Sequence, residues 1–430
     1  MKKKLSEEFV KELSELKGEP LWMRSFRLKS FQKFLTTPNP SFGPKIDIEF
    51  NTLCYYKGEY NNMKSNWAEV EQEVRNTFKT LGVINAEEKY LGGVANQYES
   101  EVIYHKTSTD KEIIFTSTDE ALKKHETLFK KYFNNLVKYD ENKYTALNGA
   151  LWSGGTFIYI PPYTKVDRPL QSYFRIDSKS LGQFERTIII LDEGAELNYI
   201  EGCTALSYSA NSLHAGVVEL YVGKKAKCRY TTIQNWSNDV YNLVTKRAIV
   251  DSEGTMEWID GNIGSKVTMK YPSVILKGDN SVANSISIAY AKENQVLDAG
   301  AKMVHLGKNT KSNIVSKSIA QSGGVANYRG LARITKKALS SCATVKCDTI
   351  IIDNISSSNT YPKNICENNS SFIEHEATVS KVNEEKLFYL TSKGLTKERA
   401  TELLVMSFIG DFKKELPMEY AVELNRLLKS

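Results

Sequence analysis

Thiol, imidazole and carboxylate side chains that can bind iron occur close together in one stretch of the chain. Cys347 lies in the run KCDTIII, and His375 and Glu376 follow in the run HEATVSK. Two further cysteines, Cys203 and Cys228, precede them on predicted strands. A site with so few soft ligands holds iron less tightly than four cysteines would. The constellation therefore predicts a labile iron site, although free cysteines are also among the residues most often buried in a core.

The motifs of several common active and cofactor sites do not occur in the sequence. The chain has no G-x-x-x-x-G-K-[ST] loop, so nucleotide hydrolysis must be supplied by a partner. It has no G-x-S-x-G elbow, and His375-Glu376 is only the first half of an H-E-x-x-H zinc motif. Cys342 and Cys347 lack the C-x₂-C spacing of ferredoxins, which argues against a permanent four-cysteine cluster.

The overall composition is that of a folded globular protein. Of the 430 residues, 41% are hydrophobic and 25% are charged, and the 23 tyrosines and 17 phenylalanines favour strands. The formal net charge of +6 is modest for this length. Because the lysines are scattered instead of forming a stripe, we do not expect the protein to bind nucleic acid.

The N-terminal segment does not fit a secretory signal. Glu7, Glu8 and Glu12 lie where a signal peptide needs an uninterrupted apolar stretch. No run approaches the ~20 apolar residues that a membrane-spanning helix requires, so we expect no membrane association. The six cysteines, with no secretory context, favour reduced thiols over disulfides. We therefore expect a soluble protein of the cytoplasm, or of the plastid stroma if it is organellar.

The pattern of apolar residues divides the chain into helical ends and a long β region. Stripes at helical spacing predict helices over about 65–82 and 119–137, which we expect to pack together. From about Phe157, short β-branched and aromatic runs alternate with turn residues at intervals of about ten residues. This spacing alone leaves a sandwich, a barrel and a parallel β-helix open. Thr396 and Pro417 can each begin a helix, which predicts a C-terminal helical pair.

Over nearly its entire length, the sequence resembles the SufB family of iron–sulfur cluster assembly scaffolds. The resemblance depends on long segments that occur in the family's order. These are GALWSGGTFIYIP, LQSYFRI, GQFERTIII, YIEGCTA, SLHAGVVEL, RYTTIQNWS, YNLVTKRA, EWIDGNIGSKVTMKYP, IVSKSIA, HEATVSK and ELPMEYAVELNRLL. The N-terminal run EPLWMRSFRLKSFQKFL is also similar to the family's opening helix.

The resemblance implies a mainly β fold in three parts. A right-handed parallel β-helix forms the core over residues 141–375. An N-terminal α/β domain, mainly helical, spans residues 1–140, and a C-terminal helical domain spans residues 376–430. The last domain is expected to dock the ATPase subunit through an apolar face that includes Leu403, Leu404 and Leu428.

The resemblance also implies partners and a cargo. Family members assemble with an ABC-type ATPase, SufC, and with a related β-helix subunit, SufD, whose place a second copy of the chain can take. A cysteine desulfurase or sulfur carrier supplies sulfur. The cargo is a transient 4Fe-4S or 2Fe-2S cluster, no nucleotide binds to this chain, and reduced flavin in the complex is a further expectation.

One set of residues is implied for sulfur transfer. YIEGC places Cys203 at the cysteine that accepts sulfur as a persulfide. Lys246 in VTKRA, Arg175 in YFRI, and Gln234 and Trp236 in TIQNW match family positions on the route from that cysteine to the cluster site. A cation close to a persulfide would stabilise its negative charge.

A second set is implied for the nascent cluster. Cys347 in KCD and Glu376 in HEA match the proposed ligands of the cluster metal, with His375 beside them. The remaining ligands would come from the SufD-type subunit. The expected function is thus a non-enzymatic scaffold that accepts persulfide sulfur and iron, assembles a cluster and passes it to apo-proteins. The alternative is a structural SufD-like subunit without cluster ligands, against which the presence of both Cys203 and Cys347 argues.

Overall fold

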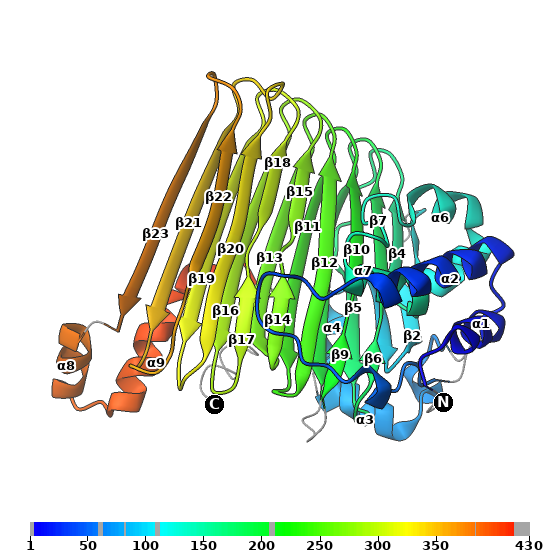
Figure 1. The fold of residues 1–430 in the computed structure, drawn as a ribbon, viewed down its shortest axis with the longest axis horizontal. Helices are drawn as coiled ribbons and strands as arrows, with labels where there is room; N and C mark the ends of the chain where they lie inside the picture. The colour runs from blue at the N-terminus through cyan, green and yellow to red at the C-terminus, as the bar shows by residue number, and fades with distance from the viewer. Residues whose placement is uncertain are drawn as a thin grey trace.

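The structure is a computed structural model that describes residues 4–58, 63–80, 83–107, 112–205, 211–382 and 384–416. Its core is a β-solenoid in which successive coils add strands to two long sheets (Figure 1). N-terminal α/β elements precede the solenoid and helices follow it. The predicted mainly β fold, with a parallel β-helix core between these two regions, is confirmed.

Sheet 1 has ten strands, and all its neighbours except β1 and β2 pair in parallel. In sheet order, its strands are β2 (Glu101–Thr107), β1 (Gly93–Tyr98), β5 (Leu170–Ile176), β8 (Glu196–Ala205), β11 (Lys227–Trp236), β13 (Thr255–Gly264), β16 (Val282–Ala291), β19 (Lys311–Ala320), β21 (Cys342–Ile351) and β23 (Phe372–Lys381). Residues paired across neighbouring coils are about thirty positions apart, for example 27 between Glu257 and Asn284 and 31 between Asn313 and Thr344. Equivalent residues therefore stack in rows along the solenoid.

Sheet 2 faces sheet 1 across the core, and most of its strands are shorter than those of sheet 1. They are β3 (Ile114–Ser117), β4 (Thr156–Ile160), β6 (Gly182–Gln183), β7 (Arg186–Leu191), β9 (Ser212–His214), β10 (Val217–Val222), β12 (Val240–Val250), β14 (Val267–Lys270), β15 (Ser273–Leu276), β17 (Val296–Ala299), β18 (Lys302–His305), β20 (Val325–Ile334) and β22 (Thr360–Cys366). Only β3 and β4 pair antiparallel among the described strands of this sheet.

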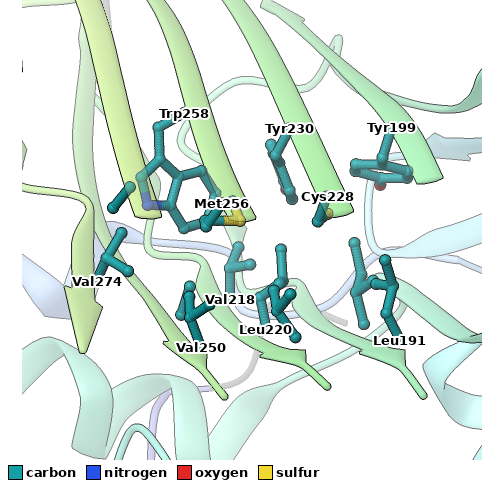
Figure 2. Close-up of a cluster of buried hydrophobic side chains, with 14 of the residues drawn as sticks. Leu191, Tyr199, Val218, Leu220, Cys228, Tyr230, Val250, Met256, Trp258 and Val274 are labelled. Carbon is teal, nitrogen blue, oxygen red and sulfur yellow. The ribbon is translucent and has the colours of Figure 1, made fainter. Parts of the chain in front are cut away.

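Alternate residues of each strand point into the core, which is apolar at one end of the strands. Tyr199, Tyr230 and Trp258 stack along sheet 1, with ring centroids 4.8 and 5.0 Å apart. They face aliphatic side chains of sheet 2, such as Leu220 and Val250 (Figure 2). Burying such large side chains supplies the main driving force for folding.

Helices cover the outer faces of both sheets. The bounds are α1 (Glu7–Leu16), α2 (Leu21–Thr36), α3 (Gln72–Thr80), α4 (Val83–Tyr90), α5 (Thr118–Lys124), α6 (Glu126–Tyr132), α7 (Lys143–Leu151), α8 (Glu384–Ser392), α9 (Lys397–Phe408) and α10 (Gly410–Lys414), with single 3₁₀ turns at Phe50–Thr52 and Trp67–Glu69. Thr396 caps α9 by accepting from the backbone of Arg399, as the sequence predicts. The second C-terminal helix predicted from Pro417, with Leu428 on its face, lies outside the described residues.

The two predicted N-terminal helices do not pack together. Phe78 of α3 belongs to the apolar cluster on the outer face of sheet 1, together with Val405 of α9. Phe129 of α6 belongs to a separate cluster against Phe157 and Ile188 of sheet 2. The prediction of mutual packing is wrong because each helix covers the outer face of a different sheet.

A segment that we call the N-terminal strap, residues 37–58, crosses the outer face of sheet 2 (dark blue in Figure 1). The Tyr241 hydroxyl donates to the carbonyl of Asp47 at 3.0 Å, which ties the strap to β12. Near the end of the strap, Cys54 pairs with Leu181 through backbone hydrogen bonds to Ser180 and Gly182. Across the described residues, we find no helix that is both long and apolar enough to cross a membrane.

Candidate functional site: two buried cysteines in one solenoid

Cys203 lies in the interior of the solenoid, near the end of β8. Its side chain is 1% exposed. Phe174 of β5 and Gln234 of β11 flank it in register. Phe174, Ile176, Leu181, Trp236 and Val240 form an apolar cluster with it, which we call the Cys203 cluster.

A carboxylate and an ammonium group lie directly beside this thiol. The Cys203 Sγ is 3.9 Å from Glu201 Oε1, the same oxygen that accepts from Lys246 Nζ at 2.8 Å. Lys246 also donates to Thr232 Oγ1 at 2.8 Å, and Tyr230 donates its hydroxyl proton to Glu201. All four polar partners are buried. Since an isolated buried charge would be very costly, the Glu201–Lys246 pair must be kept together.

The electrostatic surroundings favour a neutral thiol at Cys203. Burial raises the pKa of Cys203 well above its usual value, and Glu201 and Glu185 raise it further, while Lys246 opposes the shift. The Glu201 pKa is lowered because Lys246 and Tyr230 outweigh the raising effect of burial. A negatively charged sulfur at this position would therefore need Lys246 as its counter-ion.

Gln234 and Trp236 supply buried N–H groups next to the thiol. Gln234 Oε1 accepts from Asn242 Nδ2 at 2.8 Å. Within the described part of the chain, neither Gln234 Nε2 nor Trp236 Nε1 has a hydrogen-bond partner. A buried donor without an acceptor costs free energy, so both N–H groups can donate to an acceptor that is brought to this strand.

The polar network continues to a buried histidine. Asn242 also contacts His214, with Oδ1 and Nδ1 2.9 Å apart, and His214 Nε2 is 2.8 Å from Glu185 Oε2. Although burial alone lowers the His214 pKa, the Glu185 carboxylate raises it above its usual value. The imidazole therefore forms a charge-assisted pair in the interior.

Arg175 lies on the opposite face of sheet 1 from Cys203. Its Nε is 2.5 Å from Asp177 Oδ1, and its guanidinium donates to Thr204 Oγ1 at 2.9 Å. Tyr173, two residues earlier, packs in the outer cluster of sheet 1, which fixes the outward direction of Arg175. Lys246, Gln234 and Trp236 thus lie in the interior with Cys203, whereas Arg175 does not.

Cys347 occupies an interior position near the far end of the solenoid, on β21. Its side chain is 3% exposed, and Sγ is 3.5 Å from His375 Nε2 on β23. His375 Nδ1 lies 3.1 Å from Asn364 Nδ2, so the amide can donate to it and leave a proton on Nε2. Burial raises the Cys347 pKa to about 12, against the opposing effect of the Tyr328 hydroxyl.

Glu376 does not share the face of Cys347. It pairs in register with Lys346, and its carboxylate lies 3.5 Å from Lys346 Nζ on the outer surface. Consecutive residues of a strand point to opposite faces, so His375 points inward and Glu376 outward. The structure thus brings Cys347 and His375 together and places Glu376 at the exposed margin of the terminal strand.

A row of polar side chains joins the two cysteine regions. From the neighbour of Cys203 to Cys347, the inward positions in successive register are Glu201, Thr232, Asp260, Ser287, Ser316 and Cys347. Asp260 pairs with the buried Lys270 at 2.7 Å, and the Ser287 and Ser316 hydroxyls are 3.1 Å apart. Five strand spacings separate the ends of the row, or about 24 Å at ~4.8 Å per strand.

The other cysteines lie away from this row. Cys228 packs in the apolar core, and burial raises its pKa far above the ordinary value. Cys342 is half-buried at the start of β21, and Cys366 is exposed at the end of β22. No group of three or more His, Cys, Asp or Glu side chains among the described residues is arranged to hold a metal ion.

Several residues of this interior were not identified from the sequence. Glu201, Asp260, Lys270 and His214 are buried polar groups. The signal that could have identified them is a charged or polar residue at an inward position of a strand, two residues from an apolar one, as in YIEGC. Such a position predicts a buried charge that needs a partner.

Comparisons with known proteins agree with this architecture. Residues 7–172 match the family model described as "SufBD protein N-terminal region". Residues 174–408 match the one described as "SUF system FeS cluster assembly, SufBD core domain". Together the two models cover the N-terminal elements, the solenoid and α9.

Curated relatives are similar to this chain over nearly its entire length. An iron–sulfur cluster assembly SufBD family protein of Staphylococcus saprophyticus is 54% identical over 429 residues, which is 99% of this chain and 92% of the relative. A Staphylococcus epidermidis protein with the same family description is 53% identical over the same shares. The chain therefore belongs to the SufBD family and takes part in iron–sulfur cluster assembly by the SUF system.

Proposed function

We propose that this chain is the SufB-type scaffold, which accepts sulfur at Cys203 and contributes Cys347 to a nascent cluster. The observation that carries this proposal is the interior polar row between the two thiols, which a purely structural subunit would not need. Buried polar groups are costly in a core, and apolar side chains would stabilise the same coils better.

The surroundings of Cys203 support a role in holding a sulfur anion. The terminal sulfur of a persulfide carries negative charge and accepts hydrogen bonds. Gln234 Nε2 and Trp236 Nε1 are buried donors without a partner among the described residues, and Lys246 is the nearest ammonium group. A persulfide on Cys203 would satisfy these donors.

The surroundings of Cys347 support a role in a site that opens. Cys347 and His375 supply one thiol and one imidazole, too few to complete the coordination of a cluster. The last coil carries exposed apolar side chains, among them Phe372, Val379 and Tyr361. An unpaired strand edge with exposed apolar side chains is suited to a second β-solenoid, either a SufD-type subunit or another copy of this chain, which would supply the missing ligands. Glu376 points to the opposite face from His375, so it would bind the same metal only if the terminal strand turned when the second solenoid binds.

The C-terminal helices support docking of an ATPase subunit. Phe388 and Tyr389 of α8 and Leu403 of α9 are exposed large apolar side chains at one end of the molecule. Apolar helix faces of this kind bind partner proteins. A SufC-type ATPase on these helices could couple nucleotide hydrolysis to opening of the cluster site. Reduced flavin in the complex remains a prediction.

Anaerobic cluster reconstitution of the purified complex tests the proposal. Iron, sulfide and a reductant are added to the wild type and to Cys347→Ala, and bound iron and visible absorbance are measured. We expect Cys347→Ala to lower cluster content by at least ~10-fold, because loss of a thiolate removes the strongest ligand of the chain. Cys366→Ala is the matched control, an exposed cysteine of the next coil, and should load normally. Normal loading of Cys347→Ala would instead support a structural SufD-like subunit.

A further inference from the structure

Cys203 is too deeply buried to meet a sulfur donor directly. Only 1% of its side chain is exposed. Transfer of sulfur between two thiols needs contact between the attacking sulfur and the sulfane sulfur of the donor. If Cys203 accepts sulfur, as proposed above, an intermediate carrier at the surface would allow this transfer without opening the solenoid.

Cys54 of the N-terminal strap is a second thiol in contact with the Cys203 cluster. It pairs with Leu181, a member of that cluster. Its neighbours Leu53 and Tyr55 pack in a different apolar cluster, together with residues of α1 and α7. Since side chains alternate along extended backbone, Cys54 points inward, where it packs against the Cys203 cluster.

Cys54 also reaches the surface. It is half-buried and lines an open pocket of about 610 Å³ together with Lys4, Lys179 and Ser180. Lysine ammonium groups at the wall of a pocket attract anions, such as the negatively charged sulfur of a persulfide donor. In the structure, the Cys54 thiol donates to the carbonyl of Tyr56 at 3.4 Å.

The interior side of the same cluster provides the receiving groups. Trp236 belongs to the cluster, and its indole N–H lacks a partner among the described residues. Gln234, with its own orphaned amide N–H, lies next to Cys203 in register. Both donors are therefore available to a sulfur anion that arrives from the side of Cys54.

We infer that Cys54 is a relay thiol that takes sulfane sulfur from a persulfide donor at the surface pocket and passes it to Cys203. This inference rests on the proposed function of Cys203. In the first exchange, the Cys54 thiolate attacks the outer sulfur of the donor persulfide R–S–SH. The S–S bond of the donor breaks, Cys54–S–SH forms, and the proton lost by Cys54 goes to the departing R–S⁻.

The second exchange repeats this chemistry inside the protein. Although the neutral thiol dominates at Cys203, its small thiolate fraction attacks the outer sulfur of Cys54–S–SH, which breaks the S–S bond at Cys54 and forms Cys203–S–SH. The proton given up by Cys203 restores the Cys54 thiol. Each exchange conserves the number of thiols and persulfides, so no oxidant or reductant is consumed.

A time course of persulfide formation on the full chain tests the relay. The protein is mixed with glutathione persulfide, quenched by alkylation and digested, and persulfide on each cysteine peptide is measured by mass spectrometry. In the wild type, we expect persulfide on Cys54 to appear before that on Cys203. In Cys203→Ser it should accumulate on Cys54. In Cys54→Ser, and equally in Cys54→Ala, loading of Cys203 should be at least ~5-fold slower.

Cys342→Ser is the matched control, because Cys342 is also half-buried but lies at the start of β21. It should load Cys203 at the wild-type rate, and circular dichroism should show that all variants keep the solenoid. Wild-type loading of Cys203 in both Cys54 variants would overturn the relay while leaving Cys203 as the sulfur acceptor. Absence of persulfide on Cys203 in every protein, the wild type included, would refute the proposed function and the relay with it.

Discussion

The two cysteine regions of the solenoid differ in how they are enclosed. Cys203 lies in a middle coil, with strands on both sides and a fully paired set of charges around it. Cys347 lies one strand from the end of sheet 1, beside a terminal strand whose residues are mostly exposed. The first region is buried on all sides, and a partner can reach the second.

This difference matches two chemical demands. A persulfide decomposes by exchange with any thiol that reaches it, so a closed and charge-balanced interior protects it. A cluster must gain iron and later leave, which requires ligands that can separate. With the roles proposed for Cys203 and Cys347, one fold would meet both demands, because the ends of a solenoid differ from its middle and its rows of side chains continue from one to the other.

The largest expected effect is a loss of stability when a charge is removed from the buried interior around Cys203. Lys246→Met leaves the Glu201 carboxylate buried without a cation, which should lower the free energy of unfolding by about 3–5 kcal/mol. Urea denaturation followed by circular dichroism measures it. The double variant Lys246→Met/Glu201→Gln removes both charges and should recover part of the loss. An unchanged midpoint in Lys246→Met would mean that the interior is not closed to water.

The next largest effect is expected on thiol reactivity, which should differ strongly between a buried and an exposed cysteine. At neutral pH, we expect iodoacetamide to modify Cys203 at least ~100-fold more slowly than Cys366, because thiolate formation at Cys203 is disfavoured and access is blocked. Peptide mass spectrometry with isotope-coded reagents gives both rates. In urea the two rates should converge. Equal rates in the native protein would contradict the enclosure of Cys203.

The pH dependence of the Cys347 alkylation rate should reflect the burial of this thiol. Its pKa is raised to about 12, so the neutral thiol dominates below that pH. The thiolate fraction, and with it the alkylation rate, should rise about tenfold per pH unit between pH 7 and 10. Rates at several pH values on the isolated chain measure this slope. A plateau near pH 9 would show that the Cys347 thiol is solvated like an ordinary cysteine.

Sulfur transfer from the Cys203 region to the Cys347 region should depend on the polar row. Ser287→Val removes a hydroxyl from the middle of the row and should slow cluster formation from a persulfide donor about threefold to fivefold. Ser285→Val is the matched control, since Ser285 is buried on the same strand but lies in the row of Trp258 and Ile314. Equal rates of cluster formation in the two variants would show that sulfur delivery does not depend on the polar row.

The smallest effect is expected at the open end. Lys346→Met makes the same chemical change as Lys246→Met but at the exposed pair with Glu376. Because both side chains are solvated, the free energy of unfolding should change by less than about 1 kcal/mol. The urea midpoint measures it in parallel with the first variant. If the free energy of unfolding fell as much as in Lys246→Met, the exposed ion pair would contribute as much to stability as the buried one.

Much of the fold could be predicted from local patterns. Short β-branched and aromatic runs, such as those that contain YIEGC and KCDTIII, predict the strands, and turn residues predict where the strands end. The choice of a β-helix came from the resemblance, because strand spacing is the same in a sandwich. The packing of α3 and α6 could not be predicted, because both helices have an apolar face and only the tertiary structure selects the sheet that each one covers.

The site was predictable only in part, for a geometric reason. Cys347 and His375 meet because one coil separates them, a distance that varies from coil to coil and has to be observed. The outward direction of Glu376 follows from alternation once His375 is known to point inward. The sequence around Cys54 carries no such signal, since a strap outside the repeat brings this residue to the Cys203 cluster.

The stacking of equivalent residues in successive coils also limits how this protein can change in length. Deletion of one whole coil would bring Cys203 and Cys347 closer by one strand spacing, about 4.8 Å, and would leave every other side chain on its face. Insertion of a single residue into a strand would exchange its inner and outer faces and put apolar side chains into solvent. Evolutionary gains and losses in this core should therefore occur as complete coils or within turns, and the separation of the two thiols should change only in steps of one strand.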